Sequence, residues 1–294
     1  MTFPDSLGAP PWITDGAWGT ELQKRGLPPG GCPDAWNLTN PDAVSEVAQA
    51  YVDAGSQIIL TNTFRANGVS LAGAGLAARA REINVAGVRL SRQAAGGHAL
   101  VFASMGPTGK MLVTGEIDED SLLAAFRAQA EALATEGPDA LLLETFSDLE
   151  EAAIALGAAL TTGLPVVVSF AFDSGKNKDR TMMGVAPERA ATRMAEAGAA
   201  AIGSNCGVGI EAAAAVCRRL HAACSLPVWM KPNAGLPEVG PGGEVVYRAT
   251  AEEFAGHAAE LRDAGASFIG GCCGSTPGFI RALAAAKPGW GSDR

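Results

Sequence analysis

Eight short apolar runs alternate with longer alanine-rich segments along the chain, and this alternation restricts the fold more than any other feature. Most of the runs are almost continuously apolar, as expected for parallel strands that are buried on both faces. They cover residues 11–15, 57–63, 99–105, 140–145, 165–171, 200–206, 227–233 and 267–273. Eight strand–helix units within 294 residues predict an α/β protein with a single domain over residues 1–294, a (β/α)8 TIM barrel, whose usual size is about 250 residues.

The segments between the runs have the spacing of helices. Two examples are residues 41–54 and 121–136. Asparagine is favoured at the N-cap and proline at the first helical position, so Asn40 is expected to cap a helix that begins at Pro41.

Composition and charge exclude several classes of function. The chain has 22 lysines and arginines against 31 aspartates and glutamates, a net charge of −9, which argues against nucleic acid or an anionic membrane as a partner. No apolar run approaches the ~18 residues of a membrane span, and the first residues do not form a signal peptide. Six cysteines in a chain of this length do not form a disulfide framework. They indicate a cytoplasmic location and a role in metal binding or catalysis.

Most of the predicted strands end in residues that can carry chemistry. These residues are Asp15, Thr61, Asn62, Thr63, Glu144, Thr145, Asn205, Cys206, Lys231, Asn233, Cys272 and Cys273. In barrel enzymes the active site lies at the C-terminal ends of the strands. The site is therefore expected at this mouth, where Cys206 can meet the adjacent pair Cys272 and Cys273 despite their separation in sequence.

The three cysteines suit a catalytic zinc ion. None of them belongs to the close pairs of a zinc finger, and three protein ligands with one open position are typical of catalytic zinc, whereas a structural site fills all four. A zinc ion with three thiolates is a weak Lewis acid that still deprotonates a substrate thiol, so the site suits thiol alkylation better than hydrolysis. The alternative readings of Cys272 and Cys273 are a buried strand end and a vicinal disulfide.

Seven segments, in this order, resemble the homocysteine S-methyltransferase family, and within it the homocysteine-binding barrel of cobalamin-dependent methionine synthase. They are DGAWGTEL (15–22), TNTF (61–64), GPTG (106–109), ETFSD (144–148), NCGVG (205–209), PNAGLP (232–237) and GGCCGSTP (270–277). The resemblance implies that Cys206, Cys272 and Cys273 bind Zn²⁺. It also implies that the zinc-bound thiolate of homocysteine attacks a methyl group to give methionine.

Other strand ends match the amino-acid part of homocysteine. Asp15 and Glu144 have no basic neighbour in the sequence, so the substrate ammonium would offset the cost of burying them, and the family uses matching acidic residues for the amino group. The turn at Gly16 and Ala17 can offer backbone N–H groups to the substrate carboxylate. Asp15 could instead be a simple helix cap. Three residues that either add hydrogen bonds or only end their strands are Thr61, Asn62 and Thr145.

Asn233 is a candidate for the fourth zinc ligand. It ends the predicted strand between the two cysteine-bearing strands, so its side-chain oxygen could bind the metal until the substrate sulfur displaces it. Water in this position and turn chemistry at Asn233 are the alternatives. The other cysteines carry no prediction of a site: Cys217 and Cys224 share a helical face with His221 that is expected to be surface or core filler, and Cys32 has no identifiable partner.

The methyl donor is the least determined part of the prediction. The 17 residues after Pro277 (294 − 277) leave no room for a folate or cobalamin domain, so the favoured donor is methylcobalamin on a separate corrinoid protein. A self-sufficient enzyme that uses S-methylmethionine or a betaine-like donor is the alternative. Two readings from other classes are a vicinal-dithiol redox protein and a non-catalytic zinc-binding protein.

Overall fold

A computed structural model describes residues 8–240 and 245–290 of the chain. Its main sheet has eight parallel strands in the order β1-β10-β7-β6-β5-β4-β3-β2. A parallel bridge from Thr14 to Ile58, with the Gln57 N–H donating to the Ile13 carbonyl at 2.8 Å, joins β1 to β2. The sheet therefore closes into a barrel, as predicted. The strands are β1 (Trp12–Ile13), β2 (Ile58–Leu60), β3 (Leu100–Met105), β4 (Ala140–Phe146), β5 (Val166–Phe170), β6 (Ala201–Gly209), β7 (Val228–Asn233) and β10 (Ala266–Ile269).

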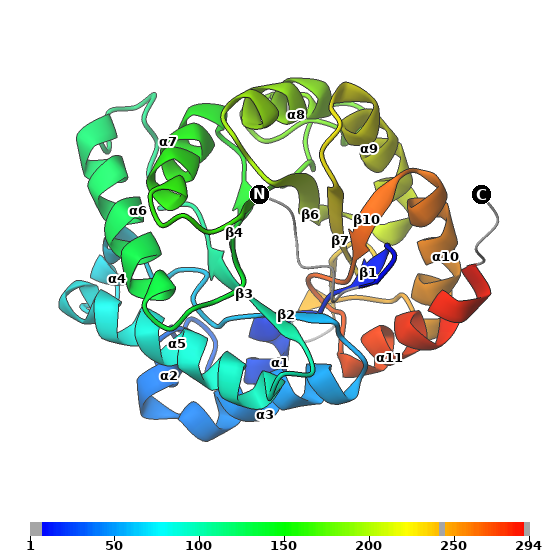
Figure 1. The fold of residues 1–294 in the computed structure, drawn as a ribbon, viewed down its shortest axis with the longest axis horizontal. Helices are drawn as coiled ribbons and strands as arrows, with labels where there is room; N and C mark the ends of the chain where they lie inside the picture. The colour runs from blue at the N-terminus through cyan, green and yellow to red at the C-terminus, as the bar shows by residue number, and fades with distance from the viewer. Residues whose placement is uncertain (1–7, 241–244, 291–294) are drawn as a thin grey trace.

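Helices form a ring around the strands (Figure 1). They are α1 (Trp18–Lys24), α2 (Trp36–Thr39), α3 (Pro41–Asp53), α4 (Gly68–Ala72), α5 (Ala80–Ala95), α6 (Glu119–Ala134), α7 (Leu149–Leu160), α8 (Pro187–Glu196), α9 (Ile210–Ala223), α10 (Ala251–Asp263) and α11 (Pro277–Ala286), with short 3₁₀ turns at Ala77–Arg79 and Lys287–Trp290. A small antiparallel hairpin, β8 (Glu238–Val239) and β9 (Val245–Val246), lies in the β7–α10 connection. Within the described ranges, no helix has the length and apolarity needed to cross a bilayer.

The two-residue period of the strands sorts the barrel interior into an apolar end and a polar end. The apolar end is a buried cluster that includes Phe102, Trp229 and Phe268, in which the Trp229 and Phe102 rings stack at 5.7 Å. Because alternate residues share a face of a strand, Lys231 follows Trp229 into the interior. Glu144 follows Leu142 in the same way. The interior is thus filled with side chains and becomes polar only toward the mouth.

Several predicted element ends differ from the structure. β6 runs three residues past the predicted end at Cys206, through an irregularity between Asn205 and Gly209. The last strand is regular only to Ile269 instead of residue 273, although the Gly270 and Gly271 N–H groups still donate to the Met230 and Asp15 carbonyls, each at 3.0 Å. Gly270 lies so close to Thr14 that a Cβ there would be 1.9 Å from the Thr14 hydroxyl. The helix from Pro41 is confirmed, and Asn40 occupies its N-cap position without the expected side-chain hydrogen bond.

Candidate thiolate site at the barrel mouth

The structure brings the three predicted cysteines together at the mouth. The sulfur atoms of Cys206, Cys272 and Cys273 all lie within 4.8 Å of one another, and those of Cys206 and Cys273 are 3.8 Å apart. No other described residues form such a group of three or more histidine, cysteine or acidic side chains. A tetrahedral zinc ion with ligands at about 2.3 Å requires sulfur atoms about 3.8 Å apart. The arrangement therefore fits three of the four ligands of a zinc ion.

The backbone that carries these sulfurs is tightly constrained. Cys206 has a φ of +59°, and the following Gly207 has a φ of +70° with no room for a Cβ, which would lie 2.8 Å from the Phe172 carbonyl oxygen. A left-handed non-glycine residue costs about 1–3 kcal/mol and often marks a functional site. The adjacent pair is fixed to β7: the Cys272 N–H donates to the Pro232 carbonyl at 2.8 Å.

Within the cluster, negative charge concentrates on one sulfur. Hydrogen bonds from the Cys272 and Cys273 thiols, followed by those of the Gly207 N–H and the Asn233 side chain, hold the pKa of Cys206 well below its usual range. The same contacts with Cys206 raise the pKa of Cys272 and of Cys273. A bound dication would favour the ionised form of all three sulfurs.

Asn205 links the cysteine strand to the end of β4. Its Nδ2 donates to the Thr145 hydroxyl at 2.6 Å, and its Oδ1 accepts from the Thr145 N–H at 2.8 Å and the Ser169 hydroxyl at 2.7 Å. Thr145 itself has a φ of +64°, a true outlier for a β-branched residue. These bonds set the position of Thr145 against the residue that precedes Cys206.

Asp15 differs from the expectation that it lacks a basic partner. Its Oδ1 forms a buried ion pair with Lys231, 216 residues further along the chain. Its Oδ2 accepts from the Trp18 ring N–H and the Leu60 N–H, each at 2.7 Å. Both oxygens are therefore occupied inside the protein. The sequence signal for this pair was a lone lysine in an otherwise apolar strand.

Glu144 is the less satisfied of the two predicted carboxylates. Its Oε1 accepts a hydrogen bond from Ser104, and no hydrogen bond to its Oε2 occurs among the described residues. Burial raises the pKa of Glu144, while the charge of Lys231 and the Ser104 bond act in the opposite direction. A cationic group beside the Glu144 Oε2 would stabilise the charged form of this carboxylate.

Three predicted substrate residues make hydrogen bonds within the protein. The Ala17 N–H donates to the Ser275 carbonyl at 3.1 Å. Asn62 donates to the Pro33 carbonyl at 2.8 Å and to Asn37 at 3.0 Å, and the Thr61 hydroxyl accepts the Ser104 N–H at 3.0 Å. In each case the hydrogen-bond partner lies in a neighbouring loop or strand end that the sequence pattern does not identify.

Asn233 lies beside the sulfurs, as predicted. Its Oδ1 accepts from the Cys273 N–H at 3.1 Å, and its side chain helps to lower the pKa of Cys206. The remaining cysteines stay outside this cluster: the buried Cys217 thiol contacts the Leu261 and Ala264 carbonyls at 3.8 and 3.6 Å, and Cys32 lies 4.0 Å from Asp34.

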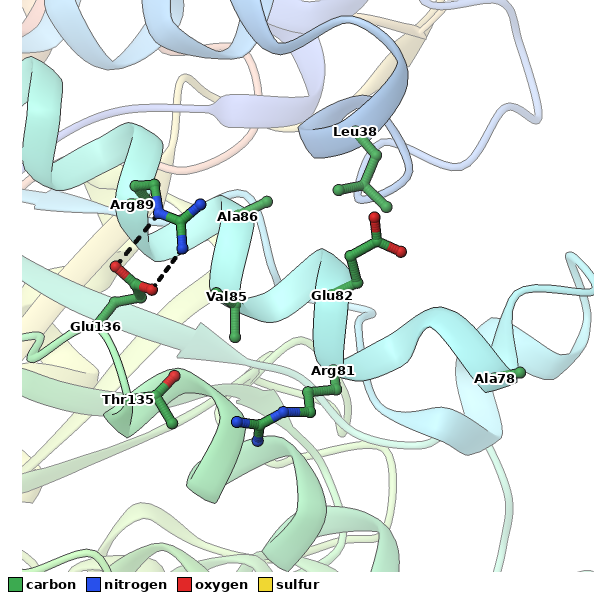
Figure 2. A pocket seen from close by; sticks show the side chains of 9 residues that line it. All are labelled: Leu38, Ala78, Arg81, Glu82, Val85, Ala86, Arg89, Thr135 and Glu136. Atoms are coloured by element: carbon green, nitrogen blue, oxygen red, sulfur yellow. Dashed lines mark hydrogen bonds and ion pairs between the residues drawn. The ribbon is translucent and has the colours of Figure 1, made fainter.

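A surface groove of about 600 Å³ lies between α5 and the C-terminal end of α6, outside the barrel (Figure 2). It is lined by Leu38, Ala78, Arg81, Glu82, Val85, Ala86, Arg89, Thr135 and Glu136. The Arg89 and Glu136 side chains pair across one end at 2.7 Å. None of the residues at the thiolate site lines this groove.

The comparison with known families agrees with the geometry of the mouth. The model of the family described as "Homocysteine S-methyltransferase" matches residues 12–287. The chain belongs to this family. Membership confirms both the predicted resemblance and the predicted methyltransferase class.

Individual relatives place the chain within the homocysteine S-methyltransferase family. It is 32% identical over 96% of its length to methionine synthase of Mycobacterium tuberculosis, and 32% identical over 93% to that of Mycobacterium leprae. It spans about a quarter (25% and 24%) of the length of these relatives. The metallated form of the homocysteine methyltransferase MmuM from Escherichia coli is similar with a TM-score of 0.77 and 27% identity, over 93% of this chain and 95% of that one.

Proposed function

We propose that this chain is a zinc-dependent homocysteine S-methyltransferase that forms methionine. The observation that carries the proposal is the cluster of Cys206, Cys272 and Cys273 in a chain of this family: the three sulfur atoms lie within 4.8 Å of one another, and the 3.8 Å between Cys206 and Cys273 suits zinc. Zinc held by the three thiolates would acidify the thiol of homocysteine and keep it nucleophilic. In the reaction, a sulfur–carbon bond forms as the bond between the methyl group and its donor breaks. A reducing compartment such as the cytoplasm would keep the three sulfurs available.

Glu144 is the proposed partner of the homocysteine ammonium. Asp15, already engaged by Lys231, Trp18 and Leu60, is the proposed second acidic residue at the ammonium. Glu144 has a free oxygen and a pKa raised by burial, and the ammonium would hold it in the charged form. Thr145, next along β4, and Gly16, at the start of α1, are the proposed contacts to the rest of the amino-acid group.

Asn233 is proposed as the displaceable fourth ligand of the zinc ion. Its side chain already contacts Cys206 and the backbone of Cys273. Its Oδ1 accepts one hydrogen bond, from the Cys273 N–H, which leaves a second lone pair for a metal ion. An Asn233→Ala variant with unchanged zinc coordination and homocysteine affinity would contradict this role.

For the donor, we propose methylcobalamin on a separate corrinoid protein. The higher identity to methionine synthases supports it. A second support is the mouth itself, because the exposed large apolar side chains of the described residues all lie in the connections that follow β3, β5 and β7. They are Val113, Met182, Met183, Leu236 and Val239. Exposed apolar side chains on the connections that follow the strand ends suit a protein-borne donor better than a small polar one.

A small onium donor is the second candidate, and the similarity to MmuM favours it. That homocysteine methyltransferase is covered over 95% of its own length by this one barrel. The two candidate donors are distinguished by measuring methionine formation when the purified chain is supplied with homocysteine and either S-methylmethionine, betaine or a methylated corrinoid protein. Turnover with a small donor alone would overturn the corrinoid proposal.

The proposal as a whole is tested at the metal. The chain is purified under reducing conditions, its zinc content is measured, and zinc-edge X-ray absorption is recorded with and without homocysteine. One zinc ion with three sulfur ligands that gains a fourth sulfur supports thiol activation. Absence of zinc, or a spectrum that homocysteine leaves unchanged, would return the cysteines to a redox or structural role, and bound homocysteine without methyl transfer would indicate a non-catalytic protein.

A further inference from the structure

Tyr247 stands directly after β9, in the connection from β7 to α10, and reaches back to the thiolate site. Burial, followed by the nearby Cys273 sulfur, raises the pKa of Tyr247, which places the phenol beside this sulfur. Once a bound metal has made Cys273 a thiolate, the phenol must be the donor in this pair, since a thiolate can only accept. The phenol thus supplies a polar contact to a sulfur that already faces Cys206.

The ring of Tyr247 is seated against the backbone next to this sulfur. A Cβ at Gly274 would lie 2.4 Å from the Tyr247 Cγ and 2.5 Å from its Cβ. Gly274 also has a φ of +82°, so the position favours glycine for two reasons. The close approach leaves the ring little freedom to swing away.

Backbone hydrogen bonds hold the segment around Tyr247 to the same place. The Ala249 N–H donates to the Ala234 carbonyl at 3.3 Å, and the Ala234 N–H donates to the Cys273 carbonyl at 2.9 Å. The tyrosine segment, the end of β7 and the cysteine loop therefore form one connected unit.

We infer that Tyr247 is a positioning residue for the metal site: its hydroxyl donates to Cys273 and holds this sulfur toward Cys206 and Cys272. The inference rests on the proposed function for the presence of zinc. Groups that hydrogen-bond to metal ligands orient them and moderate their charge, and their loss typically weakens metal binding about 10- to 100-fold.

The test is Tyr247→Phe, which keeps the ring on Gly274 and removes the hydroxyl. Zinc affinity is measured by competition with a chromophoric chelator, and the sulfur-to-metal charge-transfer bands are recorded for the cobalt-substituted protein. We expect zinc affinity to fall about 10- to 100-fold, with shifted bands and an unchanged melting temperature of the metal-free protein. Arg248→Gln is the matched control: it removes the exposed ion pair with Glu238 beside Tyr247 and should leave zinc binding unchanged.

Gly274→Ala provides a second perturbation, because the added methyl group would displace the ring while leaving the hydroxyl chemically intact. It should weaken zinc binding in the same direction. If wild type binds zinc and Tyr247→Phe matches it in affinity and bands, the inference fails and the proposed function stands. If wild type binds no zinc, the proposed function itself fails.

Discussion

Replacing Lys231 with methionine should destabilise the barrel more than any change to a surface ion pair. Lys231 has a side-chain exposure of 3% and its partner Asp15 of 0%. Removing one member of a buried pair typically costs about 3–5 kcal/mol, because the other charge stays buried without compensation. Asp15 keeps its bonds from Trp18 and Leu60, so we expect the lower end, ~3 kcal/mol.

The assay is thermal unfolding of the metal-free protein at neutral pH, which removes any stabilisation by bound zinc. At about 2 °C per kcal/mol for a chain of this size, Lys231→Met should lower the melting temperature by ~6 °C. The control Arg79→Met breaks an exposed pair with Glu82 and should cost less than ~1 kcal/mol.

The double variant Asp15→Asn/Lys231→Met decides whether the loss comes from the stranded charge. Removing both charges from a buried pair is often close to neutral, so the double variant should recover most of the stability lost in Lys231→Met. The reasoning would be refuted if Lys231→Met and the control Arg79→Met had the same melting temperature. It would also be refuted if the loss of stability in the double variant equalled the sum of the losses in the two single variants.

Three further outcomes are expected. Burial raises the pKa of Asp34 from 3.8 to about 6, so the stability that this carboxyl group contributes is complete below pH 3.8 and is lost as the pH rises to 6. The free energy of unfolding, measured relative to Asp34→Asn, should therefore fall by ~3 kcal/mol across this window. A difference between the two proteins that does not change with pH would contradict this. In Gly203→Ala the new Cβ would lie 2.1 Å from the Trp229 carbonyl oxygen, so chemical denaturation should show a loss of ~3 kcal/mol or more, whereas Gly157→Ala, a helical glycine with nothing within 4 Å, should be neutral or slightly stabilising. Glu144→Gln should weaken homocysteine binding by calorimetry about 10- to 100-fold at unchanged zinc content, the cost of a charged hydrogen bond; equal affinity would move the ammonium site elsewhere.

The sequence predicted the barrel and the meeting of the cysteines because both follow from short-range patterns combined with one topological rule. Apolar runs located the strands, and parallel strands in a closed barrel bring Cys206 to the same mouth as Cys272 and Cys273. Strand ends were less predictable. Cys206 sits inside an irregular extension of β6, and such irregularities depend on the register with β5 and β7 rather than on the local sequence.

The side-chain pairs that form across the barrel interior could not be predicted from the sequence, for a physical reason. Periodicity places Lys231 and Glu144 in the interior, but it does not determine which of several inward polar side chains will meet, because this depends on strand tilt and side-chain length. The pairing of Asp15 with Lys231 was therefore not predicted. Tyr247 was missed for a different reason, since the path of the β7–α10 connection carries no periodic signal.

The distribution of strain and charge at the mouth supports a site built for a cationic metal and an ammonium group. Among the described residues, the non-glycine positions with left-handed backbone are Thr145, Cys206 and Lys178, and the first two adjoin the thiolate cluster. Backbone strain of this kind persists when the surrounding contacts hold the residue in place. Here the Asn205 side chain is hydrogen-bonded to the backbone N–H and the hydroxyl group of Thr145, and Asn205 directly precedes Cys206. The low-pKa thiol of Cys206 and the buried carboxyl group of Glu144 lie at this mouth, where the buried Lys231 is already paired with Asp15. The charge left over is of the sign that a zinc ion and the homocysteine ammonium would neutralise, which is why metal binding and substrate binding should each stabilise this end of the barrel.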